Sequence, residues 1–187
     1  MSAPWPFVAW GMNAIEPTEP VASNGHRFIL VAIDYFTKWV EAKTLNSVTK
    51  KAVVDFVHSN IICWFGIQKV IFTNNGANLN SNLMKEGSRQ WHEKLPCTLL
   101  GYRSTIRTSV GATPYLLVYG KKVVIPAEVE ISSLRIVAAA KIDDTEWVKT
   151  RREQLGLIYE KRLAAVYHGQ LYQKRMARSY NKKDKGI

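Results

Sequence analysis

The sequence has little cysteine, few acidic residues and no long hydrophobic run. Its 187 residues include two cysteines, Cys63 and Cys97, which are too few for a disulfide framework or a structural zinc site. No apolar run reaches the length of about 18 residues that a transmembrane helix needs. The first residues also lack the charged and then apolar layout of a signal peptide. We therefore expect an intracellular, reduced protein without a membrane partner.

Basic residues outnumber acidic ones by 26 to 15, which gives a formal net charge of +11. The excess is concentrated in residues 151–187, which hold 10 basic and 3 acidic side chains. Such a tail predicts a polyanionic partner, DNA or RNA, although a merely solvated helix face is the competing interpretation. The predicted nucleic-acid-binding residues are the basic ones nearest the C-terminus: Lys174, Arg175, Arg178, Lys182, Lys183 and Lys185.

Three segments of strand length open the chain. The first spans residues 5–15, where two early prolines restrict regular pairing to the residues after them. The second is the continuous apolar run 28–33, which ends at Asp34, and the third spans 39–43. Asn24-Gly25 between the first two favours a tight turn. Sequential strands joined in this way predict an antiparallel meander.

The next segment changes to helical periodicity. Apolar residues recur at helical spacing over 48–65, with Ser47 or Thr49 as a cap and Gly66 at the end. A short strand over 68–73 follows, so that the helix is a crossover to a parallel fourth strand. Cys63 is expected to pack on the apolar face of this helix.

The sequence of the second half of the chain predicts mostly helical structure. Residues 79–105 are compatible with a helix that Pro96 interrupts, and a long basic helix is expected from 143 to about 181. Trp147, Val148, Leu155, Ile158, Leu163 and Val166 supply its partial apolar stripe. The predicted organisation is a sheet-containing front half (1–86), a helical remnant (87–120), an irregular linker (121–142) and a basic helix and tail (143–187).

Four strings in the sequence, taken together and in order, indicate a family. They are WGMNAIEP (10–17), FILVAIDYFTKWVEA (28–42), FGIQKVIFTNNG (65–76) and YRSTIRTSVGATPYLLVYG (102–120). Over roughly residues 5 to 180 the chain resembles the integrase of gypsy-type long-terminal-repeat retrotransposons. The resemblance implies an α/β, ribonuclease H-like core, here truncated, with three antiparallel strands, a parallel fourth and a long C-terminal helical extension.

The chemistry of that family implies three carboxylates that hold two divalent metals, usually Mg²⁺. Asn13 and Asn74 stand where the resemblance implies aspartates. The third ligand, a glutamate about 36 residues after the second, has no counterpart, because a block of sequence is missing between Glu86 and Gly87. The chain is therefore expected to be catalytically inactive, with Asn13 and Asn74 as vestigial positions and without a cofactor of its own.

Other carboxylates could in principle replace the missing ligands. Glu86 and Glu93 are better explained as exposed helical residues, because site geometry comes before ligand type. Asp34 ends a central strand, where a turn or capping role is the more common use. The four histidines show no metal-ligand spacing with one another or with cysteine, so no metal site is predicted.

The expected function is therefore that of an integrase-derived nucleic-acid-binding protein, intracellular and compatible with the nucleus. Two alternatives stay open: an active polynucleotidyl transferase with non-standard ligands, and a non-enzymatic module that binds a protein or RNA. Homo-oligomerisation is also left open. Loss of a strand and a helix would expose a sheet edge, so we expect low solubility of the isolated monomer.

Overall fold

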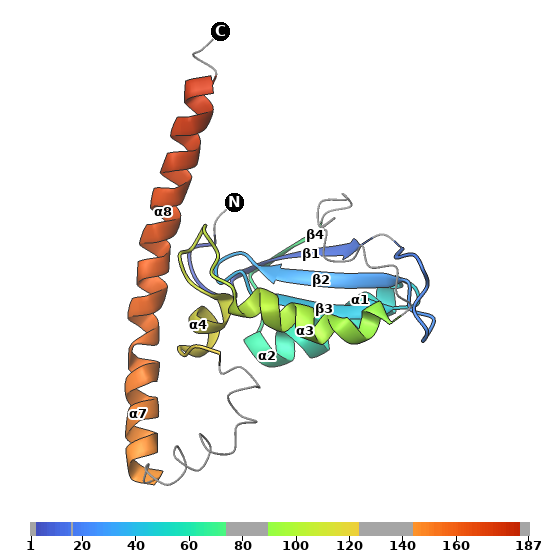
Figure 1. Cartoon of the computed structure of the whole chain (residues 1–187), viewed down its shortest axis with the longest axis horizontal. Helices are drawn as coiled ribbons and strands as arrows, with labels where there is room; N and C mark the ends of the chain where they lie inside the picture. The colour runs from blue at the N-terminus through green and yellow to red at the C-terminus, as the bar shows by residue number, and fades with distance from the viewer. Residues whose placement is uncertain (1–2, 16, 74–89, 124–143, 184–187) are drawn as a thin grey trace. The chain divides into compact units, whose positions relative to one another are not determined.

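A computed structural model describes residues 3–15, 17–73, 90–123 and 144–183. The chain divides into two compact units, Met1–Arg103 and Ser104–Ile187. The first unit contains a sheet with helices, and the described part of the second is helical with one isolated bridge (Figure 1). The predicted boundary after residue 86 and nearly all of the predicted linker lie outside the described residues.

The sheet of the first unit has four strands in the order β3-β2-β1-β4. Neighbours β1 and β2, and β2 and β3, are antiparallel, whereas β1 and β4 are parallel. This confirms the predicted mixed sheet of three antiparallel strands and a parallel fourth. The strands are β1 (Ala9–Ile15), β2 (Phe28–Asp34), β3 (Val40–Leu45) and β4 (Val70–Thr73).

The connection from β1 to β2 contains the predicted turn. Gly25 has a φ of +80°, and its N–H donates to the carbonyl oxygen of Ala22 at 2.8 Å. Glycine accepts such an angle without strain, which explains the Asn-Gly sequence at this point. β1 begins at Ala9, after both prolines, as their lack of an N–H requires.

Helix α3 (Trp91–Ser104) covers one face of the sheet (Figure 1). Trp91 and Leu95 form a buried cluster with Ile29 and Val31 of β2. Pro96 lies inside this helix, so the predicted interruption is wrong. Proline removes one backbone donor there, and burial of Trp91 and Leu95 beside it holds the helix on the sheet.

The opposite face is covered by one continuous helical segment, α1 (Lys50–Phe56), η1 (Val57–Ile62) and α2 (Cys63–Phe65) (Figure 1). The Thr49 hydroxyl caps it by accepting from the Ala52 N–H at 3.2 Å, and Gly66 ends it with a φ of +79°. On this face the Phe65 ring lies 5.3 Å from the Trp10 ring.

The central part of this segment, η1, is a π-helix. Its wider turn buries Phe56 and Ile61, which are five residues apart, on the same side. Cys63 is exposed, so the prediction that it packs in the core is wrong. The extra residue in the turn shifts the inward-facing positions away from those that a regular helix would have.

The second unit contains α4 (Pro114–Tyr119), α7 (Asp144–Gly156) and α8 (Ile158–Lys183). Helical hydrogen bonds continue across the boundary between the last two, because Leu157 donates to Glu153 and Lys161 donates to Leu157. The predicted long helix is therefore confirmed. Within the described residues, no helix is long and apolar enough to cross a membrane.

The predicted apolar stripe of this long helix is only partly correct. Val148, Leu155 and Leu163 are exposed, and the buried position of α8 is Ala165. A Cβ on Gly120 would lie 3.4 Å from Ile158, which places Ile158 on the packed side of the helix. Small residues such as Ala165 allow a helix to pack closely against its neighbours. The packed side of this long helix is therefore not its most hydrophobic side. The side chain of Trp147 lies outside the described residues.

Candidate nucleic-acid interface

Asn13 lies in the central part of the sheet. It pairs with Val31 of β2, so both residues belong to the face that α3 covers. On the other side of β1, Met12 pairs with Thr73 of β4. Thr73 is the last residue of β4 that the structure describes. Asn74 itself lies outside the described residues, as do Glu86 and Gly87.

The described residues contain no group of three or more His, Cys, Asp or Glu side chains placed to hold a metal ion. At Asn13 the side chain is a neutral amide, a poor replacement for a carboxylate near two divalent cations. Glu93 lies in the first turn of α3 and is exposed, with an oxygen 3.9 Å from His92 Nε2. This position fits the surface role that its sequence context predicts.

Asp34 is buried at the end of β2 and serves as a turn residue, as predicted. Its Oδ2 accepts from the N–H and the hydroxyl of Thr37, both at 2.7 Å. Its Oδ1 accepts from the backbone N–H of Phe7 at 3.0 Å. Burial raises the pKa of Asp34 and outweighs these hydrogen bonds, which lower it. Three donors from its own surroundings therefore occupy this carboxyl group.

The turn that Asp34 organises contains a residue in the left-handed region. Lys38 has a φ of +62°, and its N–H donates to the Asp34 carbonyl oxygen at 3.0 Å. The Lys38 ammonium lies 5.9 Å from the centre of the Tyr35 ring. Burial lowers the pKa of Lys38, while the nearby Asp34 acts in the opposite direction. Lys38 is thus a structural cation.

Arg103 is another cation with a structural role. Its guanidinium lies 4.1 Å from the centre of the Trp39 ring and 2.9 Å from Glu41 Oε1. It also donates twice to the carbonyl oxygen of Val40, at 3.0 and 2.6 Å. These contacts fix the end of α3 to β3, because the planar guanidinium can stack and donate at once.

The first basic residues of α8 hold the second unit together. Lys161 Nζ donates to the carbonyl oxygen of Gly120 at 2.8 Å. Arg162 Nε donates to the carbonyl oxygen of Leu117 at 2.9 Å. Both oxygens lie at the C-terminal end of α4, where carbonyl groups lack helical partners and a cation is favourable. These two cations are therefore used internally.

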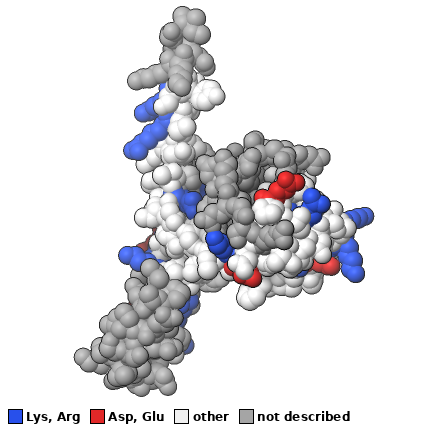
Figure 2. Space-filling view, turned by 45° about the vertical axis from the view of Figure 1, so that its right-hand side comes forward, with Lys and Arg blue, Asp and Glu red and all other residues white. Residues whose placement is uncertain are grey.

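The basic residues further along α8 are different. Lys174, Arg175 and Arg178 are exposed. From residue 161 to 183 the helix carries seven Lys or Arg residues and no Asp or Glu. In Figure 2 the described C-terminal part of α8 shows blue side chains and no red ones. Lys182 and Lys183 end the helix, but their side chains, and all of Lys185, lie outside the described residues.

Sequence reasoning missed a contact between a histidine and a cysteine. Cys63 Sγ lies 3.8 Å from His58 Nδ1, and both side chains are exposed. The five-residue separation matches the π-helical turn that contains His58. Cys97, on α3, is also exposed.

No protein-family model matches the chain, and no curated protein matches it.

Proposed function

We propose that this chain is a nucleic-acid-binding protein derived from a retrotransposon integrase, and that it neither cuts nor joins DNA. The observation that carries the proposal is the charge of α8, with seven cations and no acid over residues 161–183. Lys161 and Arg162 hold α4, so binding is assigned to the six cations nearest the C-terminus: Lys174, Arg175, Arg178, Lys182, Lys183 and Lys185.

The integrase origin is supported by the sheet. Three antiparallel strands and a parallel fourth, accompanied by helices, are the arrangement that the resemblance implies. The lack of catalysis is supported by Asn13, which offers a neutral amide where two-metal strand transfer needs a carboxylate. The ribonuclease H-like assignment and the DNA integration ancestry are parts of the same proposal.

Salt dependence tests the binding. Each phosphate contact adds about −0.7 to −0.9 to the slope of log K against log salt concentration. The triple variant Lys174→Gln, Arg175→Gln, Arg178→Gln should therefore reduce the magnitude of the slope by about 2 to 3. The matched control is Lys50→Gln, Lys51→Gln, Lys69→Gln, which removes the same charge from exposed positions of the first unit. The control should leave the slope nearly unchanged.

Equal slopes for the two triple variants would show that net charge, and not α8, carries the binding. Catalysis is tested separately by incubating the purified chain with supercoiled DNA in Mg²⁺ or Mn²⁺. We expect no nicking and no joining. Activity that disappears in Asp34→Asn, while the variant keeps the cooperative unfolding of wild type, would support the alternative of a transferase with non-standard ligands.

A further inference from the structure

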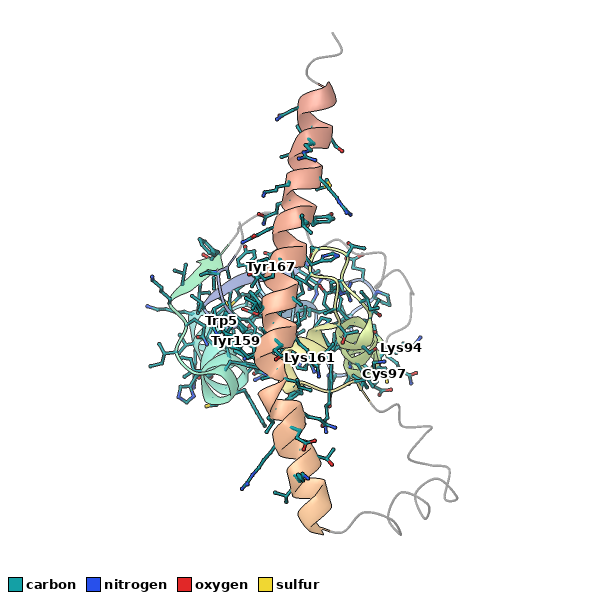
Figure 3. The ribbon with its side chains drawn as sticks, turned by 90° about the vertical axis from the view of Figure 1, so that its left-hand side faces the viewer. Trp5, Lys94, Cys97, Tyr159, Lys161 and Tyr167 are labelled. Atoms are coloured by element: carbon teal, nitrogen blue, oxygen red, sulfur yellow. The ribbon has the colours of Figure 1, made fainter. Side chains whose placement is uncertain are left out.

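The C-terminal half of α8 carries a row of four exposed side chains, which we call the Tyr167 row: Tyr167, Leu171, Lys174 and Arg178. Their separations of four, three and four residues place them on one side of the helix. At a rise of about 1.5 Å per residue, the row extends over about 16 Å. Figure 3 labels Tyr167 on this helix, beyond Tyr159 and Lys161.

Packing within the second unit does not explain the row. On the opposite side of α8, Ala165 is buried, and a Cβ on Gly169 would lie 3.5 Å from the carbonyl oxygen of Ser109. Tyr167 and Leu171 remain 60% and 55% exposed. The helix is therefore held by one side and presents a tyrosine, a leucine and two cations to solvent on the other.

We propose that the Tyr167 row binds single-stranded nucleic acid, with a base stacked on the Tyr167 ring and phosphates against Lys174 and Arg178. This inference rests on the proposed function and names the form of nucleic acid that the same helix prefers. Single-strand-binding surfaces combine these two elements: cations that follow the backbone, and aromatic rings on which bases stack. The absence of acidic residues from 161 to 183 gives the row the charge that such a ligand requires.

Tyr167 is what distinguishes a single strand from a duplex. In a duplex the bases stack on one another, and their faces are not available to a side chain. Phosphates are accessible in both single strands and duplexes, so Lys174 and Arg178 can contact either form. With stacked nucleotides about 3.4 Å apart, a row of about 16 Å matches roughly five nucleotides. Leu171, between the ring and the cations, adds apolar contact for sugars and bases.

The test compares two equally accessible tyrosines. Tyr167→Leu keeps the apolar bulk and removes the aromatic face. Tyr180→Leu is the matched control, because Tyr180 is 72% exposed on the same helix but lies about 140° round the axis from Tyr167. The probes are oligothymidylate of about 20 nucleotides and a duplex of the same length. Binding is measured by fluorescence anisotropy over a salt series.

Tyr167→Leu should weaken binding of the single strand by about 5- to 100-fold and leave duplex binding within about twofold. The salt slope should not change, because no phosphate contact is removed. Tyr180→Leu should alter neither affinity, and Tyr167→Trp should retain single-strand binding. Unchanged duplex binding also shows that Tyr167→Leu still presents the cations of α8.

The outcomes separate this inference from the function on which it rests. If the wild-type chain binds neither probe, the proposed function fails. If it binds both and Tyr167→Leu binds the single strand as tightly as wild type, this inference alone is overturned. A change in sedimentation from dimer to monomer in Tyr167→Leu would also overturn it, since the row would then be a contact between two copies.

Discussion

The carboxylate of Asp34 accepts a hydrogen bond from the backbone N–H of Phe7, 27 residues earlier in the chain, at 3.0 Å. Phe7 has a φ of +64°, in the left-handed region that disfavours a residue with a side chain. The contact therefore fixes the chain just before β1 against the turn that follows β2. The turn itself is fixed by Thr37, which donates twice to the other carboxylate oxygen.

Thr37→Val should destabilise the fold by about 1 to 3 kcal/mol, because a buried carboxyl group loses the hydroxyl donor. Thr37→Ser keeps the hydroxyl and should stay within about 0.5 kcal/mol of wild type. Urea unfolding followed by tryptophan fluorescence measures both. Equal stabilities of the two variants would show that the hydroxyl group contributes nothing.

The buried Asp34 also predicts a pH dependence. Because its folded pKa is raised above the ordinary value of 3.8, the folded state retains a proton that the unfolded state has already lost. The stability that Asp34 contributes is thus complete below about pH 3.8 and is lost as the pH rises through the folded pKa. The loss is about 1.4 kcal/mol for each unit by which the pKa is raised.

Asp34→Asn provides the reference, since asparagine does not titrate and all other groups are shared. The free energy of unfolding of wild type minus that of the variant should fall as the pH rises above 3.8 and then level off. Denaturant titrations at a series of pH values measure this difference. An increase with pH would mean that the hydrogen bonds from Thr37 and Phe7 outweigh burial.

Substitutions of Lys38 test the backbone strain in the same turn. The left-handed conformation costs a non-glycine residue roughly 1 to 2 kcal/mol, and glycine avoids this at a smaller entropic cost. Lys38→Gly should therefore be more stable than Lys38→Ala by about 0.5 to 1 kcal/mol, since both lose the same ammonium group. Thermal melts of the two variants make the comparison. The reverse order would show that this turn rearranges when the lysine is removed.

The exposure of the two cysteines predicts their reactivity. Cys63 and Cys97 are both accessible in the native chain, so both thiols should react with a disulfide reagent without denaturant. Cys63→Ala and Cys97→Ala assign the two rates, and His58→Gln should change only the rate of Cys63, whose sulfur lies 3.8 Å from that imidazole. A thiol that reacts only after unfolding would contradict the exposure that the π-helical turn gives Cys63.

The order and direction of the four strands could be predicted because each depends on local signals. Continuous apolar residues mark β2, the Asn-Gly turn joins it to β1, and helical periodicity separates β3 from β4. The exposure of Cys63 could not be predicted, since one additional residue in a helical turn leaves the apolar pattern almost unchanged. The packed side of α8 was also missed, because it is formed by small residues such as Ala165 and Gly169.

The basic residues of the candidate interface could be predicted from the sequence, but not which of them are exposed and which are used in internal contacts. Lys161 and Lys174 are alike in sequence, and both lie in the same basic helix. Only the fold shows that Lys161 donates to α4 whereas Lys174 is exposed. The contact of Asp34 with Phe7 was equally hidden, because it joins residues on either side of a hairpin.

The capping of α4 by Lys161 and Arg162 has a consequence for the folding pathway. With six residues, α4 is far shorter than the roughly 12 to 15 residues that an isolated helix needs in water. Its last carbonyl groups are bonded by side chains 41 and 45 residues further along the chain. We therefore expect α4 to become stable only once α8 has formed beside it, so that the two helices fold together.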